Sequence, residues 1–381
     1  MADNNENKVL NVPHLRFPEF SGEWNKYTIN DLATVVGGGT PDTTVKSYWG
    51  GDIQWFTPSE IGKNKYVDFS KRTITRDGLD NSSAKLLPLH TILLSSRATV
   101  GECSIASNEC TTNQGFQSLI AKQCNIDFLY YLIQTKKKDL IRNACGSTFL
   151  EISANEIRKI KVAVPVQNEQ EQIAKLLSLI DERIATQNKI IEDLKKLKSA
   201  IYQEIFSNLQ GEECSLLDLA EIIKGQQING SELSDSGKYY VMNGGIAPSG
   251  YYDSYNTEAD TISISEGGNS CGYVQYNSSE FWSGGHCYTL RIKPTSSIAT
   301  HFLFHYLKWK EPDIMALRIG SGLPNIQKKD LSKISIIVPT LDKQLQLTVL
   351  LSAFKKKIEN EEMYVANLDK QKQYLLQQMF I

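Results

Sequence analysis

Few residues in this 381-residue chain have types and spacings that could do chemistry. The glycine-rich stretch 37–41 (GGGTP) lacks the Gly-Lys-Ser/Thr sequence with which a phosphate-binding loop holds nucleotide and magnesium, so it predicts a turn. His301 and His305 have a spacing that can bind metal on a helix. However, no acidic general base lies between them, and the aromatic residues around them favour a packed helix face. The stretch 266–269 (EGGN) could seat a ligand on exposed backbone or form a plain hairpin turn.

The signatures of DNA-modifying enzymes are absent from the sequence. It contains no Asn-Pro-Pro-Tyr-like tetrapeptide and no Phe-x-Gly-x-Gly, so no adenine methyltransferase site can be read, and it has no nuclease metal constellation. Its seven cysteines include no Cys-x-x-Cys, which argues against a disulfide framework or a zinc ribbon. We therefore predict no catalytic residue and no metal ligand in this chain.

Composition places the chain among ordinary globular proteins of two or more domains, with 41% hydrophobic and 22% charged residues. A formal net charge of −2 gives no overall basic signature, so any binding of nucleic acid must be local or assisted. The lysine runs 136–138 and 355–357 favour solvated helix faces. The first residues lack the apolar core of a signal peptide, and no apolar run approaches ~20 residues, which predicts a cytoplasmic protein with no membrane contact.

The elements that must position any binding residue occur twice. VPVQNEQEQIAKLL at 164–177 is followed by VPTLDKQLQLTVLL at 338–351. One offset relates the two copies, from Gly146 and Gly320 (320 − 146 = 174) to Phe206 and Phe380. Self-similarity at a long period indicates a supersecondary unit that is used more than once. Each copy predicts a short aromatic helix, a Gly-Ser turn, a strand that ends at proline, and a long helix.

Each long helix carries a narrow apolar seam with alternating steps of four and three. A stripe of this kind cannot be buried alone, so the two helices are predicted to pair with each other. Polar residues recur within both seams, Gln187 with Glu361 and Lys198 with Lys372, either as register-setting contacts or as solvated defects. The predicted pairing residues are Ile173, Leu177, Ile180, Ile184, Ile191, Leu194 and Ile201, with Leu347, Leu351, Phe354, Ile358, Val365, Leu368 and Leu375 in the second copy.

The front part of each half is rich in turn residues and short alternating apolar runs, which predicts a β-rich head. The fold class is therefore α+β, with two unlike heads held apart by paired helices. A helix of about 35 residues spans ~50 Å, a length that fits a bipartite target such as two DNA half-sites. The predicted boundaries are an N-terminal arm at 1–25, a first head at 26–165, a central helix at 166–210, a second head at 211–339 and a C-terminal helix at 340–381.

Several motifs occur in an order that resembles a known family. The first head contains LRFPEFSGEW, YWGGDIQWFTPSEI, LLSSRATVGECSI and TNQGFQSLI. The second head contains GGIAPSGYYDSYN, TISISEGGNSCGYVQY and FWSGGHCYTL, and the helices open with PVQNEQEQI and PTLDKQLQL. On this duplicated scaffold the chain resembles the specificity (S) subunit of type I restriction-modification systems.

The resemblance implies two target-recognition domains that each read one half of a split sequence in double-stranded DNA. The long helices would pair as an antiparallel coiled coil with an internal pseudo-twofold repeat, and would dock two modification (methyltransferase) subunits. Those partners would bring S-adenosylmethionine, and restriction (translocase and nuclease) subunits would bring ATP with magnesium. The chain itself would be non-catalytic and would need no cofactor.

Polar residues at loop and strand ends are the candidate DNA contacts, because arginine pairs with guanine, asparagine or glutamine with adenine, and glutamate with cytosine. A buried turn network at 112–115 and a turn-capping role for the glutamate are the alternatives. The rival function is a non-enzymatic scaffold with two peptide-binding heads, which would show no salt-dependent DNA binding. The candidates are Trp55, Ser59, Ser95, Ser96, Arg97, Thr112, Asn113, Gln114, Asn243, Tyr251, Ser265, Glu266, Asn269 and His286.

Overall fold

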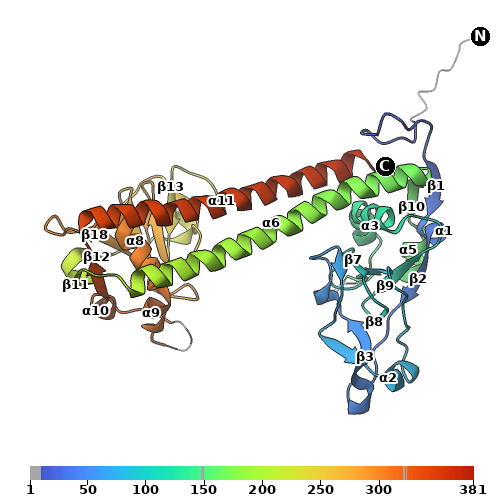
Figure 1. The fold of residues 1–381 in the computed structure, drawn as a ribbon, viewed down its shortest axis with the longest axis horizontal. Helices are drawn as coiled ribbons and strands as arrows, with labels where there is room; N and C mark the ends of the chain where they lie inside the picture. The colour runs from blue at the N-terminus through green and yellow to red at the C-terminus, as the bar shows by residue number, and fades with distance from the viewer. Residues whose placement is uncertain (1–9, 147–149, 321, 323) are drawn as a thin grey trace, which may run out of the picture. The chain divides into compact units, whose positions relative to one another are not determined.

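The computed structural model describes residues 10–146, 150–320, 322 and 324–381, which form two compact units (Figure 1). Unit 1 comprises the chain up to residue 188 together with 363–381, and unit 2 comprises 189–362. Each unit contains a β-rich head and one portion of each long helix. The Gly-Ser turns predicted at 146–147 and 320–321 lie partly outside the described residues. No helix among the described residues is long and apolar enough to cross a membrane.

The head of unit 1 contains a five-stranded sheet in the order β2-β9-β6-β7-β4 and a three-stranded sheet in the order β5-β3-β8. β1 and β10 form a separate antiparallel pair at the end of the head that adjoins the long helices. The elements are β1 (Asn25–Thr28), α1 (Ile29–Leu32), β2 (Ala33–Gly37), η1 (Lys46–Tyr48), β3 (Trp49–Phe56), η2 (Pro58–Glu60), β4 (Tyr66–Val67), β5 (Arg72–Ile74), α2 (Arg76–Asp80), β6 (Ile92–Leu94), β7 (Cys103–Ala106), β8 (Cys110–Thr112), β9 (Gln117–Ala121), α3 (Ile126–Thr135), α4 (Lys137–Arg142), α5 (Ala154–Lys159) and β10 (Lys161–Val164).

The head of unit 2 is smaller but follows the same plan. Its sheets have the orders β12-β18-β15-β16 and β14-β13-β17, and β11 pairs with β19 as β1 does with β10. The elements are β11 (Glu212–Ser215), α7 (Leu216–Leu219), β12 (Ala220–Lys224), η3 (Gly230–Glu232), β13 (Tyr239–Met242), β14 (Tyr251–Tyr252), β15 (Thr261–Ser265), β16 (Val274–Asn277), β17 (Trp282–Ser283), β18 (Cys287–Ile292), α8 (Thr300–Trp309), α9 (Glu311–Ala316), α10 (Lys328–Leu331) and β19 (Ser335–Val338).

The long helices are α6 (Gln167–Ser207) and α11 (Leu341–Gln378). They run antiparallel, since the early part of α6 meets the late part of α11 in unit 1 and the reverse holds in unit 2. The structure buries every predicted pairing position at least in part. The predicted fold class, α+β with two heads and antiparallel long helices, is confirmed.

The repeated Pro-x(4)-Gln motif joins three elements at the start of each long helix. Gln170 is buried; its side-chain amide donates to the carbonyl of Pro165 at 2.9 Å and accepts from the backbone N–H of Asn125 at 3.0 Å. Gln344 makes the equivalent two bonds 174 positions later, at 2.9 and 2.8 Å. One side chain therefore fixes the strand end, the start of the aromatic helix and the start of the long helix together, and a buried amide without these partners would be costly.

The predicted arm, described from residue 10, packs onto unit 1. Arg16 forms an ion pair with Glu169 at 2.7 Å, and the indole of Trp24 donates to the same carboxylate at 3.3 Å. The Trp24 ring makes edge contacts with Phe128 and Phe380, which stack on each other. The arm therefore belongs to the core where the two long helices meet the first head.

Candidate DNA interface

In unit 1, three loops at strand ends are joined by backbone hydrogen bonds. The N–H of Asn113, after β8, donates to the carbonyl of Phe56 at 3.0 Å, and the N–H of Ser96, after β6, donates to Gly115 at 2.8 Å. Ala98 has a positive φ of 63° and donates to Leu150 at 3.1 Å. The loop tips therefore occupy fixed positions relative to one another.

The glycine-rich stretch that begins at Gly37 enters this loop cluster because its backbone lies against other backbone. A Cβ on Gly38 would lie 1.9 Å from the carbonyl oxygen of Asn113, and one on Gly39 would lie 2.3 Å from the amide of Ala84. Neither position can hold a side chain without moving main chain. The glycines thus serve close packing of the loops.

In unit 2 the same pattern of backbone bonds recurs with different side chains. The backbone N–H of Gly284 donates to the carbonyl of Met242 at 2.8 Å, as that of Asn113 does to Phe56. The backbone N–H of Glu266 donates to the carbonyl of His286 at 2.9 Å, as that of Ser96 does to Gly115. Gly268 has a positive φ of 76° and donates to the carbonyl of residue 324 at 3.0 Å, as Ala98 does to residue 150. The heads predicted as unlike therefore share one loop scaffold.

The candidate residues separate by exposure. In the first head Arg97 is exposed, and its guanidinium lies 3.7 Å from the Glu151 carboxylate. Gln114 is exposed at a loop tip and accepts a hydrogen bond from Thr40. The buried candidates are Trp55, Ser95, Ser96, Thr112, Ser265 and Glu266; Asn113, Asn243 and Tyr251 are partly buried; and Ser59, Arg97, Gln114, Asn269 and His286 are exposed.

Several of the buried candidates hold the loops by hydrogen bonds. The indole of Trp55 donates to Gly39 at 2.9 Å, and the hydroxyl of Ser265 donates to Gly244 at 2.6 Å. The side-chain carbonyls of Asn113 and Asn243 accept from backbone N–H groups two and 43 positions on, at 2.9 and 3.1 Å. Of these bonds, the one between Asn113 and Gly115 lies within 112–115. The exposed candidates are free of these loop-holding bonds to the backbone.

Glu266 is held on two sides. It is 5% exposed, and one carboxylate oxygen accepts from the Lys224 ammonium at 2.7 Å and from the Tyr288 hydroxyl at 2.9 Å. The carboxylate and burial together raise the pKa of Tyr288, with burial the larger cause. His286 Nδ1 lies 3.8 Å from the other carboxylate oxygen, so the Glu266 carboxylate lies between Lys224 and Tyr288 on one side and His286 on the other.

The change Glu266→Gln is expected to lower the free energy of unfolding of unit 2 by about 1–2 kcal/mol, because a charge-assisted hydrogen bond to Lys224 is lost inside the loop scaffold. Urea denaturation would measure the change. The matched control is Glu221→Gln, since Glu221 forms an exposed ion pair with Arg291 at 3.6 Å, and such pairs contribute ~0.5 kcal/mol or less. Equal effects of the two changes would contradict a structural role for Glu266.

Metal-ligating side chains and reactive thiols were sought among the described residues. No group of three or more histidine, cysteine, aspartate or glutamate side chains there could hold a metal ion. Burial raises the pKa of the Cys103, Cys110 and Cys124 thiols to about 12, so these cysteines stay protonated and are poor nucleophiles at neutral pH.

Sequence comparison identifies the family. The family described as "Type I restriction modification DNA specificity domain" matches residues 21–196 and again 210–367. The chain belongs to this family. Each match covers one head and part of the long helix that follows it, so the specificity domain is present twice. Specificity subunits recognise DNA sequence and are the non-catalytic part of type I systems.

Relatives in three organisms resemble the chain. The type I restriction enzyme EcoprrI specificity subunit of Escherichia coli is 23% identical over 357 residues, 87% of each chain. The MjaIX specificity subunit of Methanocaldococcus jannaschii is 37% identical over 196 residues, which are 49% of this chain and only 45% of that protein. The crystal structure of a type I S subunit from M. genitalium has the same fold, with a TM-score of 0.65, 21% identity, and coverage of 97% and 99%.

Proposed function

We propose that this specificity subunit reads a bipartite double-stranded DNA target, with one half-site for each head. The observation that carries the proposal is the shared loop scaffold with unlike exposed side chains, Arg97 and Gln114 in the first head and Asn269 and His286 in the second. A common backbone frame presents both heads to DNA in the same way, while different side chains at the tips select different bases.

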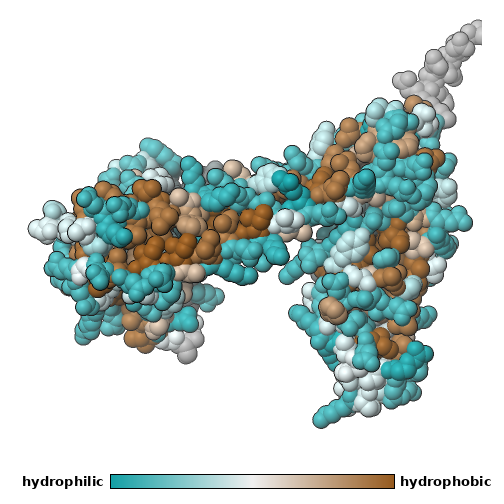
Figure 2. Space-filling model, viewed as in Figure 1, coloured by the Kyte–Doolittle hydropathy of each residue, from teal (hydrophilic) through white to brown (hydrophobic). Residues whose placement is uncertain are grey.

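We further infer that modification subunits dock on the long helices. Three apolar residues at steps of four on α11, Leu341, Leu345 and Val349, are 56%, 52% and 72% exposed. Figure 2 shows hydrophobic surface along the helices beside the head of unit 2. Exposed apolar stripes of this kind mark protein interfaces. The docked subunits would bring S-adenosylmethionine, and restriction subunits would add ATP with magnesium, all in the cytoplasm where the DNA lies.

Partner subunits also account for the charge of the chain. Phosphate neutralisation dominates the affinity of most DNA-binding proteins, yet this chain has a net charge of −2. If partner subunits supply the positive charge that neutralises DNA phosphates, this chain needs only to select the bases. A peptide-binding scaffold with no DNA role is the alternative.

Methylation mapping tests the function. The chain would be expressed with its modification subunit in a strain that lacks adenine methylation, and methylated adenines would be mapped across the genome. We expect one bipartite motif with the pair and no methylation with the chain alone. Methylation by the chain alone, or binding to DNA that does not respond to salt, would contradict the proposal.

The change Arg97→Ala is expected to relax base preference in one half-site only, by about 1–3 kcal/mol if the guanidinium binds a guanine in bidentate fashion. Affinity for substrates altered at each half-site would be measured on the assembled methyltransferase. Asn269→Ala is the matched change in the other head and should relax the other half. Equal weakening on every sequence would instead assign Arg97 to phosphate.

A further inference from the structure

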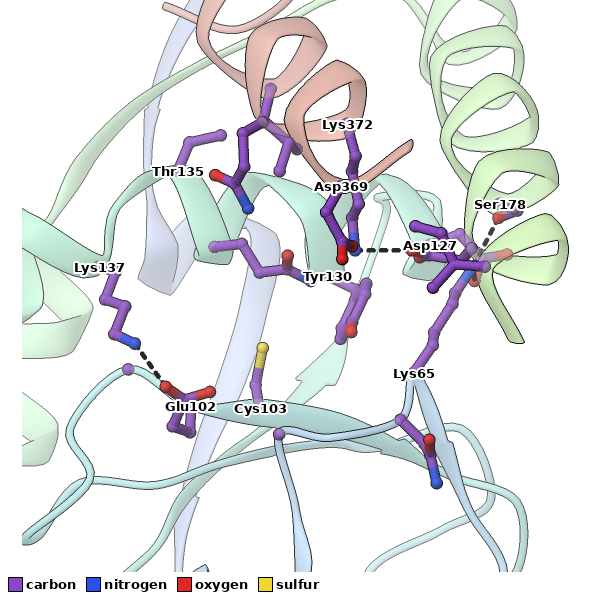
Figure 3. Close-up of a pocket in the computed structure, with 18 of the residues that line it drawn as sticks. Lys65, Glu102, Cys103, Asp127, Tyr130, Thr135, Lys137, Ser178, Asp369 and Lys372 are labelled. Atoms are coloured by element: carbon purple, nitrogen blue, oxygen red, sulfur yellow. Dashed lines mark hydrogen bonds and ion pairs between the residues drawn. The ribbon is translucent and has the colours of Figure 1, made fainter. Parts of the chain in front are cut away.

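Each unit contains a cleft between its head and the two long helices. The cleft of unit 1 has a volume of about 1190 Å³ and lies among the loop 62–66, α3, α4, α6 and α11 (Figure 3). The cleft of unit 2 has a volume of about 610 Å³ and lies among α6, α8, α9 and α11. Every residue that lines the unit 2 cleft falls, after a shift of 174 positions, on a residue that lines the unit 1 cleft. The duplicated scaffold therefore builds one cleft twice.

In the unit 1 cleft, three of the lining lysines, Lys65, Lys137 and Lys372, form ion pairs with acidic residues of the same cleft. The Lys372 ammonium lies 2.7 Å from the Asp181 carboxylate, which also accepts from the hydroxyl of Tyr131 at 2.7 Å. On the facing side, Lys65 reaches Ser178 of α6, and Lys137 pairs with Glu102 (Figure 3). The Lys372 ammonium at the centre of the first cleft thus has its counter-charge within the cleft.

In the unit 2 cleft, a lysine stands where the corresponding position of the unit 1 cleft has an aspartate. Lys198 occupies the position of Lys372 (372 − 174 = 198), and Lys355 occupies the position of Asp181 (355 − 174 = 181). The central ion pair of the first cleft thereby becomes a pair of like charges, which repel each other at short range.

Among the described residues, Lys198 is the one lysine lining this cleft that forms no ion pair, although the nearby Glu359 and Glu311 carboxylates offset part of the lowering of its pKa. The other lysines have acidic neighbours, Lys195 with Glu362, Lys308 with Glu311 and Lys355 with Glu359. Lys198 is half-buried beside the Tyr202 ring, and no described carboxylate pairs with it. Burial first, and then the neighbouring lysines 308 and 355, lower the pKa of its ammonium. Such a group gains from any anion that enters the cleft.

We propose that the unit 2 cleft binds an acidic side chain presented by a segment of a partner protein. A carboxylate would lie between Lys198 and Lys355 and supply the negative charge that Asp181 provides in the first cleft. The cleft is far larger than one anion and is also lined by Trp309, Pro312 and Ile358, which offer apolar contact to a polypeptide. A subunit docked on the long helices under the proposed function could present this segment, but the preference for a carboxylate rests on the cleft alone.

A peptide titration on the full chain tests the proposal without DNA or any other subunit, so its outcome is independent of the proposed function. The probe is a synthetic peptide of glutamate and leucine, with its glutamine counterpart as the neutral control at equal ionic strength. The signal of ¹³C-labelled His305 reports binding, because its ring bonds Tyr202 at 2.6 Å beside Lys198. The acidic peptide should shift this signal saturably, and the glutamine peptide should not.

Two variants locate the binding. Lys355→Asp recreates the Asp–Lys pair of the first cleft and should weaken acidic-peptide binding about tenfold or more, a change of ~1.4 kcal/mol or above. Lys198→Gln should weaken binding similarly without adding an acid. Lys356→Asp makes the same change of net charge at an exposed neighbour and should weaken binding less than about twofold. A cooperative urea transition with the wild-type far-ultraviolet circular dichroism spectrum would show that each variant keeps the fold.

Three results would overturn the proposal. The first is no saturable shift with the acidic peptide. The second is equal weakening by Lys355→Asp and Lys356→Asp, which would indicate general charge attraction. The third is binding of inorganic phosphate as tight as that of the peptide at the same charge concentration, which would make the cleft a simple anion site and remove the protein partner.

Discussion

Replacing Asp181 by alanine should lower the free energy of unfolding of unit 1 by about 3 kcal/mol. Asp181 and Lys372 are only 17% and 15% exposed, and the hydroxyl of Tyr131, on a fully buried ring, donates to the same carboxylate. Removing the acid leaves the Lys372 ammonium without its ion-pair partner and leaves the Tyr131 hydroxyl with only the Ser178 hydroxyl, at 3.4 Å, in a site that is mostly shielded from solvent. Breaking one side of a buried pair costs ~3–5 kcal/mol, and the residual exposure here places the value at the lower end.

Two further variants make the experiment specific. The double change Asp181→Leu with Lys372→Met should recover much of the loss, because apolar residues of similar size often replace a buried pair at little cost. Asp80→Ala removes the exposed pair with Arg76, whose side chains are 56% and 71% exposed, and should cost less than ~0.5 kcal/mol. Urea denaturation of the three variants gives the comparison. Similar losses for Asp181→Ala and Asp80→Ala would show that the cleft pair does not stabilise the head–helix joint.

The elements that the sequence predicted well are those whose signal is periodic. The apolar seam of α6 and α11 repeats over many turns, and each proline that ends β10 and β19 marks where a long helix can start. The observed bounds of α6, Gln167–Ser207, lie within three residues of the predicted 166–210. The apolar seam side chains are the ones through which α6 and α11 pack on each other. Their spacing in the sequence was therefore enough to predict the two paired helices.

The shared loop scaffold of the heads could not be predicted from the sequence. It is formed by hydrogen bonds between backbone groups, which do not depend on residue type. Phe56 corresponds to Met242 and Ser96 to Glu266, so side-chain identity is lost while the N–H and C=O positions are kept. The sequence did contain one sign of this similarity between the heads. Asp31-Leu32-Ala33 recurs as Asp218-Leu219-Ala220, and the same offset of 187 positions relates Gly38 to Gly225 (225 − 38 = 187). Both glycines donate to corresponding carbonyls, those of residues 116 and 287. Insertions that change the offset farther along the heads hide this relation.

Burial of the candidate DNA contacts was also beyond the sequence. Trp55, Ser95 and Thr112 have polar atoms at strand ends, which made them candidates, but whether such an atom faces solvent or a neighbouring loop depends on contacts between distant segments. The indole of Trp55, for example, meets Gly39 across 16 positions. The contact of Arg16 with Glu169 spans 153 positions and has no local signature at all.

Acidification should destabilise unit 2 through His305. The imidazole is 2% exposed, with Nδ1 at 2.6 Å from the Tyr202 hydroxyl and Nε2 at 3.1 Å from the Ser352 hydroxyl. Burial, and then Lys198, His301 and Lys355, lower its pKa from 6.5 to about 4. The native state thus holds the ring neutral while the unfolded chain binds a proton at higher pH, so this stabilisation is full above pH 6.5 and is lost as the pH falls towards 4.

Between pH 7.5 and 5.0 this one group should remove about 2 kcal/mol from the free energy of unfolding, since one unit of pKa difference corresponds to 1.36 kcal/mol. The change His305→Gln keeps a polar side chain but cannot titrate, so the variant should lose less stability than the wild-type chain by that amount over the same range. Urea denaturation at the two pH values gives the difference, and a ¹³C-histidine titration gives the pKa itself. A pKa of His305 near 6.5, or parallel pH profiles for both chains, would mean that the neighbouring lysines and burial do not act on this ring. The same lysines line the unit 2 cleft, so acidic peptide bound there should raise the pKa of His305 and make the pH profile shallower.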